Sequence, residues 1–184
     1  MAALAAAGGE ILIVVGYLDQ GGRGIIRSAL DSGAFTRFFL PDAMVGDSLA
    51  QAIGPALNGS FGTTPGSDSP GGARFEQMAR AANINLGPFT HQSYDAAALV
   101  LLAMQAANST DSARVKEHIM AIANGPGETI NAGDLARGLR ILAAGGRINY
   151  EGASAVRLVA PGEAAGAFRL IEVRNGRMET TGFR

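Results

Sequence analysis

The stretch from Ile11 to Thr64 decides the fold, and it opens with the strand-like run Ile11-Leu12-Ile13-Val14-Val15. This run is apolar and largely β-branched, which is typical of a strand buried on both faces of a parallel sheet. Further strands are predicted at residues 37–40 and 60–64, with helices at residues 25–30 and 49–56 between them. The resulting βαβαβ order predicts a parallel sheet with right-handed crossovers.

Beyond this stretch the chain becomes mainly helical and then returns to strand. A segment from Thr64 to Gly72, rich in Gly, Pro and Ser, precedes four predicted helices. Two of these helices start near residues that favour a helix N-cap, Ser93 and Asp111. An alternating strand at residues 167–173 and the turn signal Asn175-Gly176 close the chain. We therefore expect an α/β chain with two lobes joined by more than one crossing.

Composition excludes several classes of function. The 184 residues carry a net charge of -1, so the chain offers no basic surface for nucleic acid or for an anionic membrane. Cysteine is absent, which removes disulfides, thiolate nucleophiles and Cys-based zinc sites. Residues 1–10 lack the pattern of a signal peptide, and the longest strongly apolar run is too short to span a bilayer.

The residues after the first predicted strand partly match two nucleotide-binding motifs. Gly16 and Gly21 have the spacing of a P-loop, but Gly22-Arg23 stands where that motif needs Lys followed by Ser or Thr. The same region resembles a Rossmann fingerprint with Asp42 placed for a ribose contact, yet Arg27 is bulky where the motif needs a small residue. The alternative explanation is that these glycines only shape a turn between strand and helix.

Residues for catalysis or metal binding are scarce. The sequence has no G-x-S-x-G motif, and His91 and His118 are its only imidazoles. Two histidines cannot supply most zinc sites without several carboxylates. We read His118 as a solvated helix residue and His91 as a polar loop residue, and we expect no catalytic residue, no metal and no cofactor.

A binding site is the remaining possibility. In an open parallel sheet, ligands bind beyond the carboxyl ends of the strands. Tyr17 follows the first strand and Asp42 follows the second, so both should project from the same edge. A carboxylate there can hold an ammonium group, and a tyrosine supplies an aromatic wall with a polar tip. Alternatively, Tyr17 covers the sheet edge and Asp42 belongs to a helix N-cap.

At these residues the sequence resembles the second lobe of the branched-chain amino acid-binding proteins, the substrate-binding components of ABC transporters. The segments that carry the resemblance follow one another in order along nearly the whole chain. They are Val14–Tyr17, Gly24–Ala29, Leu40–Asp42, Gly59–Pro65, Gln92–Ala96, Asn149–Ser154 and Gly166–Val173.

The resemblance implies parts of two Rossmann-like lobes of a type I periplasmic binding protein, each a three-layer αβα arrangement. It assigns residues 1–64 and 162–184 to the second lobe, and residues 65–161 to the helical portion of the first lobe with the hinge crossings. By the same resemblance, Tyr17 and Asp42 reach the ligand's α-amino group, while Phe89 and Tyr94 line the cleft from the other lobe. Asp42 departs from the longer Glu of some members, so its reach to the ammonium is indirect or the ligand differs.

The family implies a periplasmic protein that binds branched-chain or related amino acids, or amides, and delivers them to an ABC permease in the inner membrane. A ligand-sensing receptor or regulator of the same fold is the alternative, and an NAD(P)-binding oxidoreductase is a lesser one. Family members are roughly twice as long, so we expect the chain to be a C-terminal half. Its exposed sheet edges would then favour a dimer.

Overall fold

The computed structural model describes residues 2–184, which divide into two units. Unit 1 consists of residues 2–65 and Phe168–Arg184, and unit 2 consists of Gly66–Ala167. The structural boundaries therefore follow Pro65 and Ala167, whereas the sequence places them after residues 64 and 161. The chain leaves unit 1 once and returns to it once, and each unit is described by itself below.

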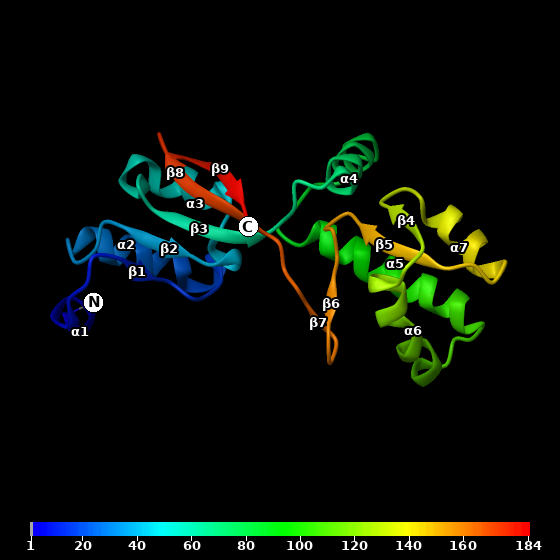
Figure 1. Ribbon diagram of the computed structural model, residues 1–184. Helices are drawn as coiled ribbons and strands as arrows, with labels where there is room; N and C mark the ends of the chain where they lie inside the picture. Colours follow the sequence, from blue (N-terminus) through cyan, green and yellow to red (C-terminus); the bar gives the residue numbers. More distant parts are fainter. Residues whose placement is uncertain (1) are drawn as a thin grey trace. The chain divides into compact units, whose positions relative to one another are not determined.

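Unit 1 is built on one five-stranded sheet with the order β1-β2-β3-β8-β9 (Figure 1). Its elements are α1 (Ala2–Ala7), β1 (Leu12–Ile13), the turn η1 (Leu18–Gly22), α2 (Arg23–Asp31), β2 (Phe38–Leu40), the turn η2 (Asp42–Met44), α3 (Asp47–Ile53), the turn η3 (Gly54–Leu57), β3 (Phe61–Pro65), β8 (Phe168–Arg174) and β9 (Arg177–Phe183). The first three strands are parallel, which confirms the predicted βαβαβ order.

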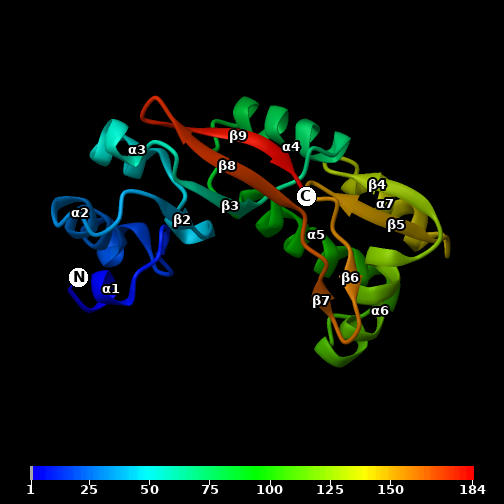
Figure 2. The same ribbon diagram turned by 60° about the vertical axis from the view of Figure 1, so that its left-hand side comes forward.

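The last two strands extend this sheet in the opposite direction. β8 runs antiparallel to β3, and β9 runs antiparallel to β8, as Figure 2 shows beside β3. Arg174 pairs with Arg177 across the turn, and both residues between them have positive φ, 51° at Asn175 and 69° at Gly176. A two-residue hairpin turn needs that backbone conformation, so the predicted Asn-Gly hairpin is confirmed.

The core of unit 1 lies on one face of the sheet. Val14, directly after β1, and Phe38 and Leu40 of β2 pack with Ile26 of α2 and Leu49 of α3, and all are buried. Such burial contributes about 1.5–3 kcal/mol for each large side chain that leaves water. This single cluster fixes how α2 and α3 lie on the strands.

The opposite face of β1 is exposed, which corrects the expectation that residues 11–15 are buried on both faces. Ile13 is 61% exposed and Val15 is 82% exposed, whereas Val14 between them is 3% exposed. The reason is the position of β1, which forms the edge of the sheet next to β2 alone. Successive side chains of a strand point to opposite faces, and among the described residues α2 and α3 contribute to the core on one face only.

Unit 2 is mainly helical. Its elements are α4 (Pro70–Ala81), α5 (Thr90–Ala107), α6 (Ser112–Asn124), β4 (Glu128–Asn131), α7 (Leu135–Ala143), β5 (Ile148–Gly152), β6 (Leu158–Val159) and β7 (Glu163–Ala164). No helix among residues 2–184 is long and apolar enough to cross a membrane. The buried side chains of α5 and α6 pack against Ile130 of β4 and Ile148 of β5.

Two predicted helix starts had different outcomes. Asp111 caps α6, because its side chain accepts a hydrogen bond from the Arg114 amide at 3.1 Å. Ser93 does not cap α5, which begins at Thr90 instead. The Thr90 hydroxyl accepts from the Gly87 amide at 2.7 Å and fixes the chain before the helix. Ser93 therefore lies inside the first turn of α5.

The strands of unit 2 differ from the expectation that this region is helical with hinge crossings. β4 and β5 form a two-stranded parallel sheet, with Ile130 opposite Tyr150. β6 and β7 form a second, antiparallel pair. These strands have two to five residues each, too few for a periodic pattern to be recognised.

Candidate functional site

Tyr17 lies at the start of a tight turn after β1. Its backbone carbonyl accepts hydrogen bonds from the amides of Gln20 and Gly22, both at 3.1 Å. Gly21 has a φ of 102°, a conformation that glycine adopts without strain. The turn holds the Tyr17 backbone in place while leaving its side chain 65% exposed. The aromatic ring is therefore accessible to a ligand.

Asp42 begins the turn η2, directly after β2 and Pro41. Its Oδ1 accepts a hydrogen bond from the Ala43 amide at 2.7 Å. The turn is closed by the amides of Met44 and Val45, which donate to Pro41 and Asp42 at 2.8 Å and 3.1 Å. No second hydrogen bond of the Asp42 carboxylate is found among residues 2–184, so its other oxygen can accept from a ligand.

The structure brings the two turns into contact. Gly22, in the turn that follows Tyr17, packs against Met44, in the turn that starts at Asp42. A Cβ added to Gly22 would overlap the Met44 sulfur and lie 2.8 Å from the Tyr17 carbonyl oxygen. Met44 is fully buried, so it has little room to move. This close contact explains why a glycine is needed at position 22 without invoking a bound nucleotide. It agrees with the alternative that the glycines shape a turn between strand and helix.

Phe89 and Tyr94 lie in unit 2 near the start of α5. Phe89 directly precedes the helix and is 45% exposed. The Tyr94 hydroxyl accepts a hydrogen bond from the Gly133 amide at 3.0 Å, and its ring lies 4.9 Å from the ring of Phe75. Tyr94 therefore helps to hold α4 and the β4–α7 loop against α5, while Phe89 leaves apolar surface accessible.

Asp95 was missed as an individual residue, although it lies in one of the segments quoted for the family resemblance. It is 2% exposed and accepts four hydrogen bonds. Tyr150 OH and the Ala153 amide donate to Oδ1, each at 2.7 Å, and the Ser154 amide and hydroxyl donate to Oδ2 at 2.7 Å and 2.5 Å. Burial and the neighbouring Asp95 raise the pKa of Tyr150. The available signal was an acidic residue directly before the long apolar stretch of α5.

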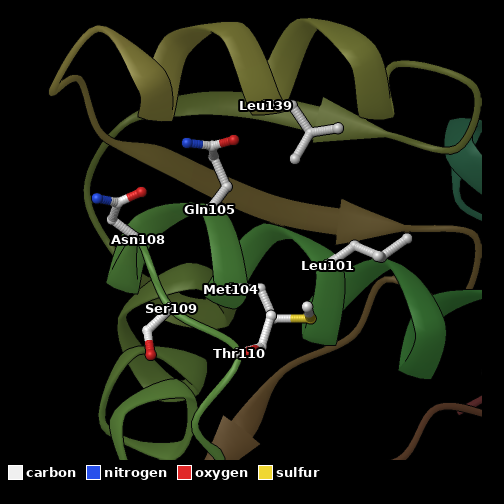
Figure 3. Close-up of a pocket in the computed structure, with 7 residues that line it drawn as sticks. All are labelled: Leu101, Met104, Gln105, Asn108, Ser109, Thr110 and Leu139. Atoms are coloured by element: carbon white, nitrogen blue, oxygen red, sulfur yellow. The ribbon is translucent and has the colours of Figure 1, made fainter.

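Neither of two open hollows formed by the described residues is lined by Tyr17 or Asp42. The first, of about 560 Å³, is shown in Figure 3 between α5, the loop after it, and α7. It is lined by apolar side chains and by uncharged polar side chains: Leu101, Met104, Gln105, Asn108, Ser109, Thr110 and Leu139. Without a charged side chain it cannot neutralise the two charges of an amino acid, so it is a poor candidate for that ligand.

The second hollow lies on the sheet of unit 1 and also has a volume of about 560 Å³. Phe39 and Phe61 contact each other edge to face there, with ring centroids 5.5 Å apart. Arg37 and Glu172 also line it. A hydrogen bond from Arg174 lowers the pKa of Glu172, and the two form an exposed ion pair at 2.6 Å. This hollow is away from the carboxyl ends of the parallel strands.

No metal centre is found in the described part of the chain. Residues 2–184 contain no group of three or more His, Asp or Glu side chains placed to hold a metal ion. His91 lies 3.8 Å from Glu76 and its ring is 4.9 Å from that of Phe75. His91, which the sequence predicts to lie in a loop, is thus part of α5 and packs against α4. His118 likewise lies on a helix, α6, where it is half-buried.

Comparison with known proteins identifies the architecture. No family model matches the chain. A chemotactic signal transduction system substrate-binding protein, BasB, of Halobacterium salinarum is 31% identical over 127 residues, which are 68% of this chain and 31% of that protein. The leucine-binding protein LivK from Thermotoga maritima superposes with a TM-score of 0.70 and 20% identity, over 99% of this chain and 47% of that chain.

A second solved structure gives the same result. A branched-chain amino acid ABC transporter protein from Thermus thermophilus with bound valine matches with a TM-score of 0.61 and 16% identity, over 98% of this chain and 47% of that chain. The chain thus spans about half the length of these structures and about a third of the curated relative. The predicted α/β fold class is confirmed, and the chain has the type I periplasmic-binding fold of ABC transporter solute-binding proteins.

Proposed function

We propose that this chain contributes to a solute-binding protein that holds a small amino acid, or a related amide, without changing it chemically. The observation that carries this proposal is the contact between two turns at the carboxyl ends of parallel strands, one presenting Tyr17 and the other Asp42. Ligands of open α/β sheets bind at this edge. The similar solved proteins are described as binding leucine or valine.

The chemistry of the two side chains suits an ammonium group. A carboxylate and an ammonium form charge-assisted hydrogen bonds, which are about twice as strong as those between neutral groups. The Ala43 amide already engages Asp42 Oδ1 and orients the carboxylate. The exposed ring of Tyr17 can pack over the ligand and can attract its positive charge through the ring face.

We propose separately that Phe89, in unit 2, offers apolar surface to a ligand side chain. Its exposed surface and its position before α5 support this role. Tyr94 would contribute ring surface, while its hydroxyl accepts a hydrogen bond from the Gly133 amide. Binding of this kind needs no proton transfer and no nucleophile, so the proposed function is not enzymatic.

The proposed partner is an ABC permease in the inner membrane, and the proposed location is the periplasm. Both follow from the kind of protein that shares the fold. A sensor is the second candidate, because the curated relative is described as part of a chemotactic signal transduction system. A permease gene next to the gene for this chain would favour transport, and a receptor gene would favour sensing. Dimerisation through sheet edges stays a prediction.

The proposal is tested by nuclear magnetic resonance titration of the ¹⁵N-labelled chain. Leucine, valine, an aliphatic amide and NAD are added separately at millimolar concentration. We expect the amino acids or the amide to shift the amide signals of Tyr17 and Ala43, which lie in the two turns. Shifts with NAD alone would favour the oxidoreductase alternative and contradict the proposal.

A further inference from the structure

A partly enclosed cavity of about 380 Å³ lies wholly within unit 2. It is formed where the end of α5, the outer part of α6, the end of α7 and the start of β5 meet, elements that Figure 1 shows next to one another. Ala121, Ile122, Leu142 and Ile148 form its apolar wall. The wall contains no aromatic side chain, so it suits an aliphatic group.

Two basic side chains also line this cavity, His118 from α6 and Arg147 directly before β5. No acidic residue lines it. Within residues 2–184 neither basic side chain has an ion pair or a hydrogen bond, whereas Arg74 pairs with Asp134 at 2.9 Å. A guanidinium beside an apolar wall, in a cavity that no acidic residue lines, is complementary to an anion with an apolar tail.

Two glycines of the turn after α7, Gly145 and Gly146, also line the cavity. Gly145 has a φ of 77°, and a Cβ added there would meet no atom within 4 Å. The Gly145-Gly146 turn thus follows α7 without adding a side chain to the lining of the cavity. The volume falls within the range of about 300–1,000 Å³ that is usual for small-molecule sites.

We infer that this cavity binds a small aliphatic monocarboxylate. The alkyl chain packs against Ile122, Leu142 and Ile148, and the carboxylate accepts paired hydrogen bonds from the Arg147 guanidinium. His118 donates an additional N–H, which an imidazole carries in either protonation state. The inference does not rest on the proposed function, because it uses only residues of unit 2.

The test is a titration of the ¹⁵N-labelled 184-residue chain with hexanoate and, in parallel, with hexanamide, which has the same tail but no charge. Hexanoate is expected to shift the amide signals of Ile122 and Ile148, and hexanamide to bind at least about tenfold more weakly. Arg147→Gln should weaken hexanoate binding by a similar factor. Arg157→Gln removes an exposed charge that does not line the cavity and should leave binding unchanged.

A second pair of variants tests the cavity itself. Ala121→Phe places a ring in the cavity and should abolish the shifts, whereas Ala113→Phe, at an exposed position of the same helix outside the cavity, should not. The inference is overturned if hexanoate shifts no amide of the cavity wall, or if Arg147→Gln and Arg157→Gln bind equally well. It is also overturned if hexanoate shifts only the Tyr17 and Asp42 turns, a result that would leave the proposed site intact.

Discussion

The carboxylate of Asp95, on α5, accepts a hydrogen bond of 2.7 Å from the hydroxyl of Tyr150, on β5. Both residues are buried, at 2% and 1% exposure. The remaining lone pairs of Asp95 are occupied by donors of Ala153 and Ser154. The buried Asp95 carboxylate thereby joins helix α5 to strand β5.

Removal of the Tyr150 hydroxyl tests this link. Tyr150→Phe keeps the ring in the core but removes one donor from Asp95, so the free energy of unfolding should fall by about 1–2 kcal/mol. Asp95→Ala leaves several buried donors without an acceptor and should cost about 3 kcal/mol or more. Urea unfolding followed by circular dichroism measures both. Equal stability of Tyr150→Phe and the unchanged chain would contradict the assigned role.

The same pair predicts how stability changes with pH. Burial and Asp95 raise the pKa of Tyr150 in the folded state, so the folded protein keeps a proton that the unfolded chain loses above about pH 10. The stability due to this group is therefore complete below about pH 10 and falls at higher pH, by at most about 1.4 kcal/mol per pH unit. The difference in unfolding free energy between the protein and Tyr150→Phe isolates this effect from other titrating groups. A difference that does not change between pH 9 and 11 would exclude it.

Gly152 should not tolerate alanine. Its φ is 62°, and a Cβ there would overlap the Asp95 carboxylate and lie 2.6 Å from Tyr150 Cε1. We expect Gly152→Ala to lower the melting temperature by several degrees, as a loss of about 2 kcal/mol or more would do. Gly24→Ala is the matched control, because Gly24 lies in α2 with open space around it. That variant should gain up to about 1 kcal/mol, and a loss at both positions would argue against the local explanation.

The neighbouring residues Val14 and Val15, directly after β1, test which face of this edge of the sheet is covered. Val14 is buried against α2 and α3, so Val14→Ala should cost about 1–3 kcal/mol. Val15→Ala should change stability by about 0.5 kcal/mol or less, because that side chain is 82% exposed. Thermal unfolding of the two variants gives the comparison. A large loss for Val15→Ala would show that its face is covered in solution.

Much of unit 1 could be predicted because its strands and helices are local patterns. The apolar runs at residues 11–15 and 37–40 and the Asn175-Gly176 turn specify conformations that neighbouring residues alone favour. The exposure of Ile13 could not be predicted in this way, since an apolar run does not show whether a second layer is present. The edge position of β1 decides it.

The prediction was weaker where distant residues decide. The short strands β4 and β5 are stabilised by their pairing with each other. Helix α5 begins at Thr90 and not near Ser93, because the Thr90 hydroxyl accepts a hydrogen bond from the Gly87 amide. For the candidate site, the positions of Tyr17 and Asp42 follow from the order of strands and turns. The Gly22–Met44 contact that joins their turns links residues 22 positions apart, and no motif signals it.

The central claim is that Asp42 holds a ligand ammonium group, and a leucine titration of Asp42→Asn tests it most directly. The variant keeps the size and shape of the side chain but loses its charge, so the shifts at Tyr17 and Ala43 should need at least about tenfold more leucine. Asp47→Asn, an exposed position at the start of α3, removes the same charge and should titrate like the unchanged chain. If Asp42→Asn and Asp47→Asn respond to leucine equally, Asp42 does not bind the ammonium group and the account is wrong.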